Sequence, residues 1–514
     1  MIPRLFKERT QTEERVAKDI ISEPSRTLAE YRLLPGLTQE RTSADCDGIS
    51  LRTPLAWAEE QTTAWSLNIP VVAAAMRSVS GYKMAVELAK CGGTAFIPCS
   101  QPVEEQVEEI RRIKDHKAGF VRPLAVRPGT TIMGVEQLKA ETGYSTFPVT
   151  DDAGVFLGLL TQRDYDPVVH QDLRVDQRMV SRSELDVLVG TPNLATANAR
   201  LVDGHQSVLP ILSEDGILRH LVFRKDIQDQ LHFPLQVVDE RKRWIAAAAV
   251  NTHDYEERVA ALVDAEVDVL CIDASDGHAE YQRQALAWCS SHAPQIPVIA
   301  GNVITAEGFR YLADAGAHGV KVGMGSGSIC ITQEQKGTGR GLATAIIDVC
   351  RERDLFFEQT GRYLPVIADG GVVNAKDIVI ALALGADYVM MGRYFARMDE
   401  SPTEKVQIGG RVMKPYWGEG SAKARQWLEK RYQQARFVEG VEGFVEYAGK
   451  LVDSLSGTLA KIRASMASCG CCSIEELHRN ARVELVSGLS IREGRVHDVY
   501  LPEREDRSSG WPYM

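Results

Sequence analysis

Eight short apolar runs in this 514-residue chain each end in glycine or a polar residue, and each is followed by a helix-like stretch. Short runs that are apolar throughout are typical of strands buried on both faces of a parallel sheet. Eight such strands alternating with helices predict an α/β fold, a (β/α)8 TIM barrel. The runs are NIPVVAAAM (68–76), GGTAFIP (92–98), RWIAAAAVN (243–251), VDVLCIDASDG (267–277), PVIAGNV (297–303), GVKVGMGSG (319–327), PVIADGG (365–371) and DYVMMGRYF (387–395).

The polar ends of these runs indicate where the chemistry lies. In such a barrel the active site is built at the carboxyl ends of the strands, and the Asp, Ser, Asn, Cys and Gly residues of the runs occur there. For any single run, a glycine that only makes a tight turn is the better explanation. For eight ends together, tight turns alone are not the better explanation.

Charge and composition exclude several classes of protein. The net charge of −11 argues against nucleic-acid binding, which needs clustered Lys and Arg. No apolar run approaches the roughly 18 residues of a membrane span, and the charged start has no apolar signal-peptide core. The ten cysteines are scattered apart from CGCC (469–472), which lacks further ligands at metal-site spacing. We expect a cytoplasmic protein without a membrane partner.

An internal repeat interrupts the barrel. Roughly 140 residues separate the second and third runs, far more than a loop in a compact domain. Within them TFPVTDDAGVFLGLLTQRDY (146–165) aligns without a gap with VLPILSEDGILRHLVFRKDI (208–227). Each copy predicts a strand, an acidic turn with glycine, a second strand and the polar start of a helix.

The repeat resembles the paired units called cystathionine-β-synthase (CBS) domains, which often bind adenine or guanine nucleotides. A structural insertion that binds nothing is the alternative, and the sequence leaves both open. The expected organisation is an N-terminal extension (1–22), a first barrel part (23–120), a CBS pair (121–235, repeats 121–176 and 177–235), a second barrel part (236–500) and a C-terminal tail (501–514).

A glycine-rich stretch, GSGSICITQEQKGTGRG (325–341), surrounds Cys330. Glycines 323, 325 and 327 allow the backbone to turn sharply and to approach a ligand closely. Ser328 can donate to a phosphate oxygen. Asp369-Gly370-Gly371 and Gly392-Arg393, after the seventh and eighth runs, lie at the usual phosphate position of this fold. A nucleotide held there would approach Cys330, whose thiolate is a nucleophile.

Several motifs together resemble the family of inosine-5′-monophosphate (IMP) dehydrogenase and guanosine-5′-monophosphate (GMP) reductase. They are GMGSGSICIT (323–332), ADGGV (368–372), MMGRYFA (390–396), YWGEGS (416–421) and REGRVHDV (492–499). The resemblance covers the chain from about Glu23 to Val499. It implies NAD-dependent oxidation of IMP to xanthosine 5′-monophosphate, the step that commits IMP to guanine nucleotides, through a covalent thioimidate on Cys330.

A flap at about 417–440 would distinguish the two enzymes. In the dehydrogenases an Arg-Tyr pair on this flap activates water, and Arg431-Tyr432 fits that pair. Arginine has a pKa above about 12, so the role requires a partner that shares the proton. An exposed charged helix, LEKRYQQAR (428–436), is the alternative.

The resemblance also implies the remaining site residues. Thr332 would contact the reacting centre. NAD would be held by Asp273, Ser275, Asn302, Gly323, Met324 and Gly325. IMP would be held by Ser328, Asp369, Gly370, Gly371, Gly392, Arg393, Tyr416, Gly418, Glu419, Gly420 and Glu439. Potassium would bind carbonyls of Gly325, Gly327 and Cys330 together with Glu493, Gly494 and Arg495 of a neighbouring subunit, which implies a homo-oligomer, a tetramer in the family.

Arg77 departs from the family, whose members carry a shorter or uncharged residue near the substrate. It could disturb the site or bind phosphate. Three functions remain open at this point. They are IMP dehydrogenase, an NADPH-dependent GMP reductase, and a catalytically silent nucleotide sensor built on the repeat pair.

Overall fold

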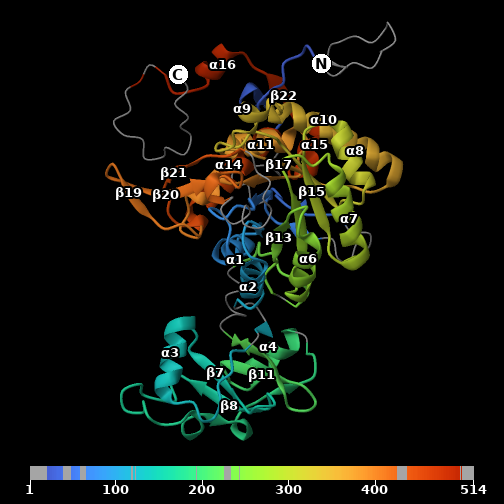
Figure 1. Ribbon diagram of the computed structural model, residues 1–514. Helices are drawn as coiled ribbons and strands as arrows, with labels where there is room; N and C mark the ends of the chain where they lie inside the picture. Colours follow the sequence, from blue (N-terminus) through green and yellow to red (C-terminus); the bar gives the residue numbers. More distant parts are fainter. Residues whose placement is uncertain are drawn as a thin grey trace, which may run out of the picture.

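The computed structural model describes residues 20–38, 48–57, 65–116, 120–121, 123–192, 194–224, 233–241, 243–424, 437–497 and 499. Eight parallel strands close a barrel (Figure 1). In order around it they are β4 (Val71–Ala73), β5 (Thr94–Ile97), β13 (Ala247–Val250), β14 (Val269–Asp273), β15 (Val298–Val303), β16 (Gly319–Val322), β17 (Val366–Asp369) and β18 (Tyr388–Met391). Each lies inside one of the eight apolar runs, so the predicted barrel is confirmed.

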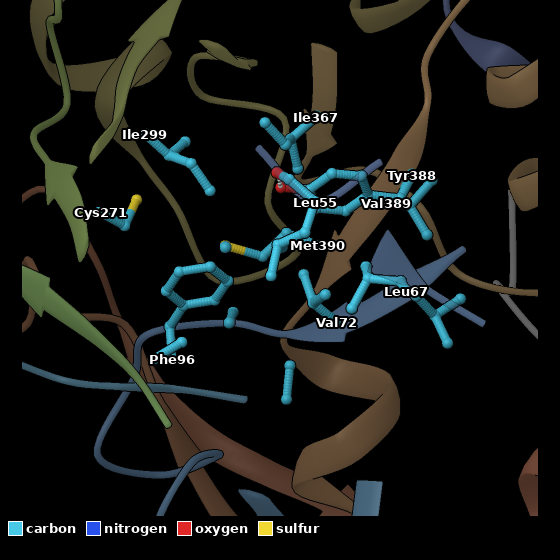
Figure 2. Packing of buried hydrophobic residues seen from close by; sticks show 14 of the residues in the cluster. Leu55, Leu67, Val72, Phe96, Cys271, Ile299, Ile367, Tyr388, Val389 and Met390 are labelled. Atoms are coloured by element: carbon cyan, nitrogen blue, oxygen red, sulfur yellow. Dashed lines mark hydrogen bonds between the residues drawn. The ribbon is translucent and has the colours of Figure 1, made fainter. Parts of the chain in front are cut away.

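The barrel interior is filled by side chains from alternate strand positions. Val72, Phe96, Cys271, Ile299, Ile367 and Met390 meet there (Figure 2). The buried Tyr388 hydroxyl donates to the Leu55 carbonyl at 2.9 Å, which ties the N-terminal segment to the barrel. The interior is therefore a packed core, and ligands are restricted to its ends.

Helices surround the barrel. They are α1 (Tyr82–Lys90), α2 (Val103–Lys114), α6 (Tyr255–Asp264), α7 (Glu280–His292), α8 (Ala306–Asp314), α10 (Leu342–Thr360), α11 (Ala375–Ala383) and α14 (Leu451–Ser468). In α14, for example, Leu455, Leu459, Ile462 and Met466 share a buried face, while Lys461 is exposed. None of the helices in the described ranges is both long enough and apolar enough to cross a membrane.

Shorter elements lie outside the ring of barrel strands. β1 (Tyr31–Leu34) pairs with β22 (Arg482–Leu485), β2 (Thr53–Pro54) pairs with β3 (Ser66–Leu67), and β19 (Val406–Ile408), β20 (Arg411–Trp417) and β21 (Glu442–Glu446) form a projecting sheet (Figure 1). The remaining barrel elements are η1 (Leu28–Glu30), α9 (Thr332–Lys336), α12 (Arg393–Ala396), α15 (Ile474–Asn480) and α16 (Gly488–Glu493).

The insertion is a separate layered unit with its own small hydrophobic clusters. Its elements are β6 (Phe120–Val121), α3 (Ile132–Thr142), β7 (Thr146–Thr150), β8 (Phe156–Thr161), η3 (Val175–Gln177), β9 (Val180–Ser181), η4 (Arg182–Glu184), β10 (Leu188–Val189), α4 (Leu194–Asp203), β11 (Val208–Leu212) and β12 (Leu218–Phe223). They form two sheets, β7-β8-β9 and β10-β11-β12-β6. In Figure 1 the inserted unit lies below α2.

The two repeats have the same strand register. Pro148 lies opposite Leu159 in β7–β8, and Pro210 lies opposite Leu221 in β11–β12. The two turns also bond to each other reciprocally, because the Phe156 amide donates to Gly216 O at 3.0 Å and the Leu218 amide donates to Gly154 O at 3.1 Å. The predicted strand-turn-strand repeat is confirmed.

The prediction of a helix after the first repeat is wrong. Residues 162–174 contain turns and bends and no helix. The Asp164 carboxylate accepts from the amide and hydroxyl of Thr161 at 2.6 and 2.8 Å, and Asp166 Oδ1 accepts from the amides of Val168 and Val169. Short acidic side chains compete in this way with helix formation. After the second repeat, residues 225–232 lie outside the described residues.

A buried ion network lies where the chain leaves the barrel for the insertion and returns. Lys114, the last residue of α2, contacts Asp239 at 3.0 Å and Asp268 at 2.6 Å. Arg243 contacts Asp239 at 3.0 Å and Glu266 at 2.7 Å. The network joins both connecting segments to the amino end of β14, the end of the barrel opposite the predicted active site.

Candidate active site

The Cys330 loop is held between β17 and the carboxyl end of the predicted flap, residues 439–441. The loop leaves β16 at Gly323, whose φ is +140° and where a Cβ would overlap the carbonyl oxygen of Asp369. Further on, the Ile331 amide donates to Glu439 O at 2.9 Å, and the Val441 amide donates to Ile329 O at 3.0 Å. These bonds fix the backbone on both sides of Cys330. Gly327, in contrast, has an ordinary negative φ.

Three side chains form a hydrogen-bonded chain that starts at the cysteine. Cys330 Sγ lies 3.0 Å from Thr332 Oγ1, and that hydroxyl donates to Glu439 Oε2 at 3.1 Å. The Lys336 ammonium lies 3.7 Å from the same carboxylate oxygen. Thr332 is buried and Cys330 is half-buried. A proton on the thiol therefore has a direct path to a carboxylate.

A lysine that the sequence analysis missed links the predicted cofactor and substrate aspartates. Lys321, buried in β16, bonds to Asp273 Oδ1 and, at 2.9 Å, to Asp369 Oδ2. Burial alone would lower the pKa of this ammonium, but the two carboxylates outweigh burial and raise the pKa above its ordinary value. The sequence feature that could have indicated Lys321 is a lysine inside an apolar strand, GVKVG.

An open cavity of about 970 Å³ lies beside the Cys330 loop. It brings together six of the predicted substrate residues, namely Ser328, Gly370, Gly371, Gly392, Arg393 and Tyr416. A Cβ at Gly392 would lie 2.8 Å from the Tyr416 hydroxyl, so a larger residue there would displace Tyr416. Burial raises the pKa of Tyr416 to about 12, which keeps its hydroxyl protonated as a donor.

Other predicted substrate residues lie outside the lining of this cavity. Asp369 is bonded to Lys321, and Glu439 to Thr332. Gly418 and Gly420, at the start of the predicted flap, pair with its carboxyl end, since the Gly418 amide donates to Val441 O and the Glu439 amide donates to Gly420 O.

Glu419 contacts the loop between β4 and α1. Its carboxylate accepts from the Arg77 amide at 2.9 Å, and burial raises its pKa from 4.5 to about 7. The Arg77 guanidinium lies 3.5 Å from Glu105 on α2 and does not line the cavity. The phosphate role weighed for Arg77 therefore has no support in the geometry.

The predicted cofactor residues line the rim formed by β14, β15 and β16. Asn302 Nδ2 donates to Gly323 O at 2.8 Å and to Asp369 Oδ2 at 2.9 Å. Its buried Oδ1 has no partner among the described residues and can accept a hydrogen bond from a ligand. Ser275 is exposed at the rim, and the Met324 carbonyl accepts from Gln333 Nε2 at 3.1 Å. The orphaned amide oxygen and the Asp273 carboxylate fit a ligand that carries an amide and a ribose diol.

Comparison with known proteins identifies the family. The sequence profile described as "IMP dehydrogenase / GMP reductase domain" matches residues 31–497. The chain belongs to this family.

Relatives in the family include enzymes of both kinds. The inosine-5′-monophosphate dehydrogenase of Tritrichomonas foetus is 46% identical over 497 residues, 94% of this chain and 98% of the relative. That of Halalkalibacterium halodurans is 36% identical, covering 88% and 92%. Among solved structures, GMP reductase from Trypanosoma brucei, a cysteine-to-alanine variant in complex with guanosine 5′-monophosphate, superposes with a TM-score of 0.85 at 27% identity, covering 93% of this chain and 99% of the other.

Two features predicted from the IMP dehydrogenase / GMP reductase family remain predictions. Arg431 and Tyr432 lie outside the described residues. For potassium, Gly325, Gly327, Gly494 and Arg495 line the same cavity, whereas Glu493 and Cys330 do not. The Gly327 carbonyl already accepts the Cys330 amide at 3.0 Å and keeps a second lone pair for a cation.

Proposed function

We propose that this protein oxidises IMP to xanthosine 5′-monophosphate with NAD as hydride acceptor. The observation that carries the proposal is the hydrogen-bonded chain from Cys330 through Thr332 to Glu439. A sensor without catalysis would need neither a nucleophile nor a path for its proton. The identity of 46% over nearly the whole chain with a named IMP dehydrogenase supports the same conclusion.

The first half of the reaction forms a covalent adduct. The Cys330 proton passes to Thr332 Oγ1 as the hydroxyl proton passes to Glu439, and the resulting thiolate adds to C2 of the hypoxanthine ring. When bound, NAD accepts the hydride that leaves C2. The C2–H bond breaks as the C2–S bond is retained, which leaves a thioimidate. Asp273 and the Asn302 amide oxygen would hold the ribose and the amide of the cofactor.

The substrate is held at two ends. Asp369 would accept from the ribose hydroxyls of IMP, since a carboxylate can accept two hydrogen bonds from a diol. Ser328, the Gly371 amide and Arg393 line the cavity where the phosphate would lie. Tyr416 would donate to the same phosphate. The hypoxanthine ring would then reach Cys330 at the other side of the loop.

The second half hydrolyses the adduct. Water attacks C2, the C2–S bond breaks, and the Cys330 thiolate is released with xanthosine 5′-monophosphate. Arg431, with Tyr432 as the partner that shares the proton, would take the proton from water. Glu439, protonated in the first half, returns its proton through Thr332 to the thiolate.

Potassium would bind the loop carbonyls that the family uses. Backbone carbonyls of Gly325, Gly327 and Cys330 suit a large, weakly hydrated cation, and the second set would come from Glu493, Gly494 and Arg495 of a neighbouring subunit in a tetramer. The rate in potassium chloride should exceed the rate in lithium chloride at equal ionic strength. Equal rates in the two salts would argue against the site.

The inserted unit would be a CBS pair that binds a purine nucleotide. A cavity of about 510 Å³ is lined by Arg219, His220 and Arg241, and a basic wall of this kind suits phosphate groups. Measuring the melting temperature of the protein as ATP or GTP is added tests this role. No shift at millimolar nucleotide would favour a purely structural insertion.

The alternative activity is reduction of GMP with NADPH, favoured by the TM-score of 0.85 with a GMP reductase. The deciding assay follows NADH absorbance with IMP, NAD and potassium, beside Cys330→Ala. Growth of absorbance that the variant abolishes supports the dehydrogenase. If NADPH is instead consumed on addition of GMP, the protein is a reductase, and inactivity in both assays would leave the sensor.

A further inference from the structure

A buried lysine joins the two aspartates that the proposed function assigns to the two substrates. Lys321 Nζ bonds to Asp273 Oδ1 and Asp369 Oδ2, and within the described residues these are the only hydrogen bonds of its ammonium. The side chain is 3% exposed, so no water-facing position competes for it. A buried ammonium in this arrangement is neutralised only by these two carboxylates.

The geometry leaves each aspartate with one oxygen for a ligand. Oδ2 of Asp369 is occupied by Lys321 and by Asn302 Nδ2 at 2.9 Å. Oδ1 of Asp273 is occupied by Lys321. The other oxygens, Oδ1 of Asp369 and Oδ2 of Asp273, make no hydrogen bond to the described part of the chain. The ammonium therefore fixes both the position and the direction in which each carboxylate meets its ligand.

We propose that Lys321 is a positioning residue that couples the binding of the two substrates, because it sets the separation and orientation of Asp273 and Asp369. This inference rests on the proposed function, in which Asp369 holds the IMP ribose and Asp273 holds the cofactor ribose. When the IMP ribose donates to the Asp369 carboxylate, the Lys321 ammonium shifts toward Asp273. When the NAD ribose donates to the Asp273 carboxylate, the ammonium shifts toward Asp369. Loss of the ammonium would let two like charges repel across the site.

The experiment compares Lys321→Met and Lys321→Arg with a matched control, Lys114→Met. Lys114 is also buried and also bridges two aspartates, Asp239 and Asp268, but at the opposite end of the barrel. We expect Lys321→Met to raise KM for IMP and for NAD at least tenfold each, and Lys321→Arg to recover part of the loss in both. Lys114→Met should lower the melting temperature and leave both KM values within twofold of the parent.

A second variant keeps the proposal testable if Lys321→Met does not fold. In Asp273→Asn the ammonium is retained, but its pairing shifts entirely to Asp369. The dissociation constant for IMP, measured without NAD by isothermal titration, should then change at least threefold although Asp273 does not touch IMP. An unchanged constant would overturn the coupling, as would KM values for Lys321→Met that match Lys114→Met. An inactive parent protein would instead overturn the proposed function.

Discussion

The hydroxyl of Thr332 lies 3.0 Å from the sulfur of Cys330. The same hydroxyl donates to Glu439, so its removal leaves the thiol without an acceptor for its proton. We expect Thr332→Val, which keeps the shape of the side chain, to lower kcat by about 10²-fold, within the range for loss of general-base assistance. Stopped-flow measurement of the first turnover of NADH checks this.

Thr332→Ser is the matched control because serine retains the hydroxyl. It should keep the rate within about threefold of the parent. Glu439→Gln retains a hydrogen-bond acceptor but cannot take the proton, so it should resemble Thr332→Val. A Thr332→Val enzyme with the parent's first-turnover rate would show that the proton leaves Cys330 by another path.

Gly323 is the glycine of the loop with the least room. Its φ of +140° is unfavourable for any other residue, and a Cβ would overlap Asp369 O. Gly323→Ala should therefore displace the Cys330 loop and lower kcat/KM at least 100-fold, measured by initial rates. The control is Gly457→Ala in α14, where a Cβ meets nothing within 4 Å. It should raise stability by about 0.5–1 kcal/mol.

The barrel could be predicted because each strand is buried on both faces. Each strand is therefore a short run of apolar residues that can be recognised without its neighbours. The helix predicted after β8 failed because the local bonds of Asp164 and Asp166 favour turns, and periodicity does not report such bonds. Lys321 escaped prediction for a different reason. Its partners, Asp273 and Asp369, each lie 48 positions away, and only closure of the barrel brings the three together.

The role of Glu439 shows the same limit. The resemblance assigned it to IMP binding, which stays a prediction. Its bond to Thr332 spans 107 positions and depends on the pairing of residues 439–441 with the Cys330 loop. The residue types of the site were evident from the motifs, whereas the contacts between motifs required the fold.

Arg393 lines the cavity in which the phosphate of IMP is proposed to lie. A charge-assisted hydrogen bond of this kind contributes about 1.5–3 kcal/mol. Arg393→Met should accordingly raise KM for IMP by roughly 10–100-fold and leave kcat/KM for inosine, which lacks the phosphate, nearly unchanged. The KM of Arg393→Lys for IMP should lie between that of the parent and that of Arg393→Met. Equal losses for IMP and inosine would mean that Arg393 shapes the site without binding phosphate.

Glu419 makes stability depend on pH. Burial raises the pKa of its carboxyl from 4.5 to about 7. Between these values the folded protein holds a proton that the unfolded chain has released, so the contribution of Glu419 falls as pH rises through this window and is constant above it. The full change is on the order of 3 kcal/mol, at about 1.4 kcal/mol per pH unit.

Glu419→Gln removes this ionisation and keeps an acceptor for the Arg77 amide. Its melting temperature should be close to the parent's at pH 5 and several degrees higher at pH 8, measured by differential scanning calorimetry. Glu105→Gln, which removes an exposed carboxylate on the neighbouring α2, serves as the control and should follow the parent at both pH values. A constant difference between Glu419→Gln and the parent across this range would show that Glu419 ionises at its ordinary pH in the folded protein, because only a shifted pKa makes the two curves diverge.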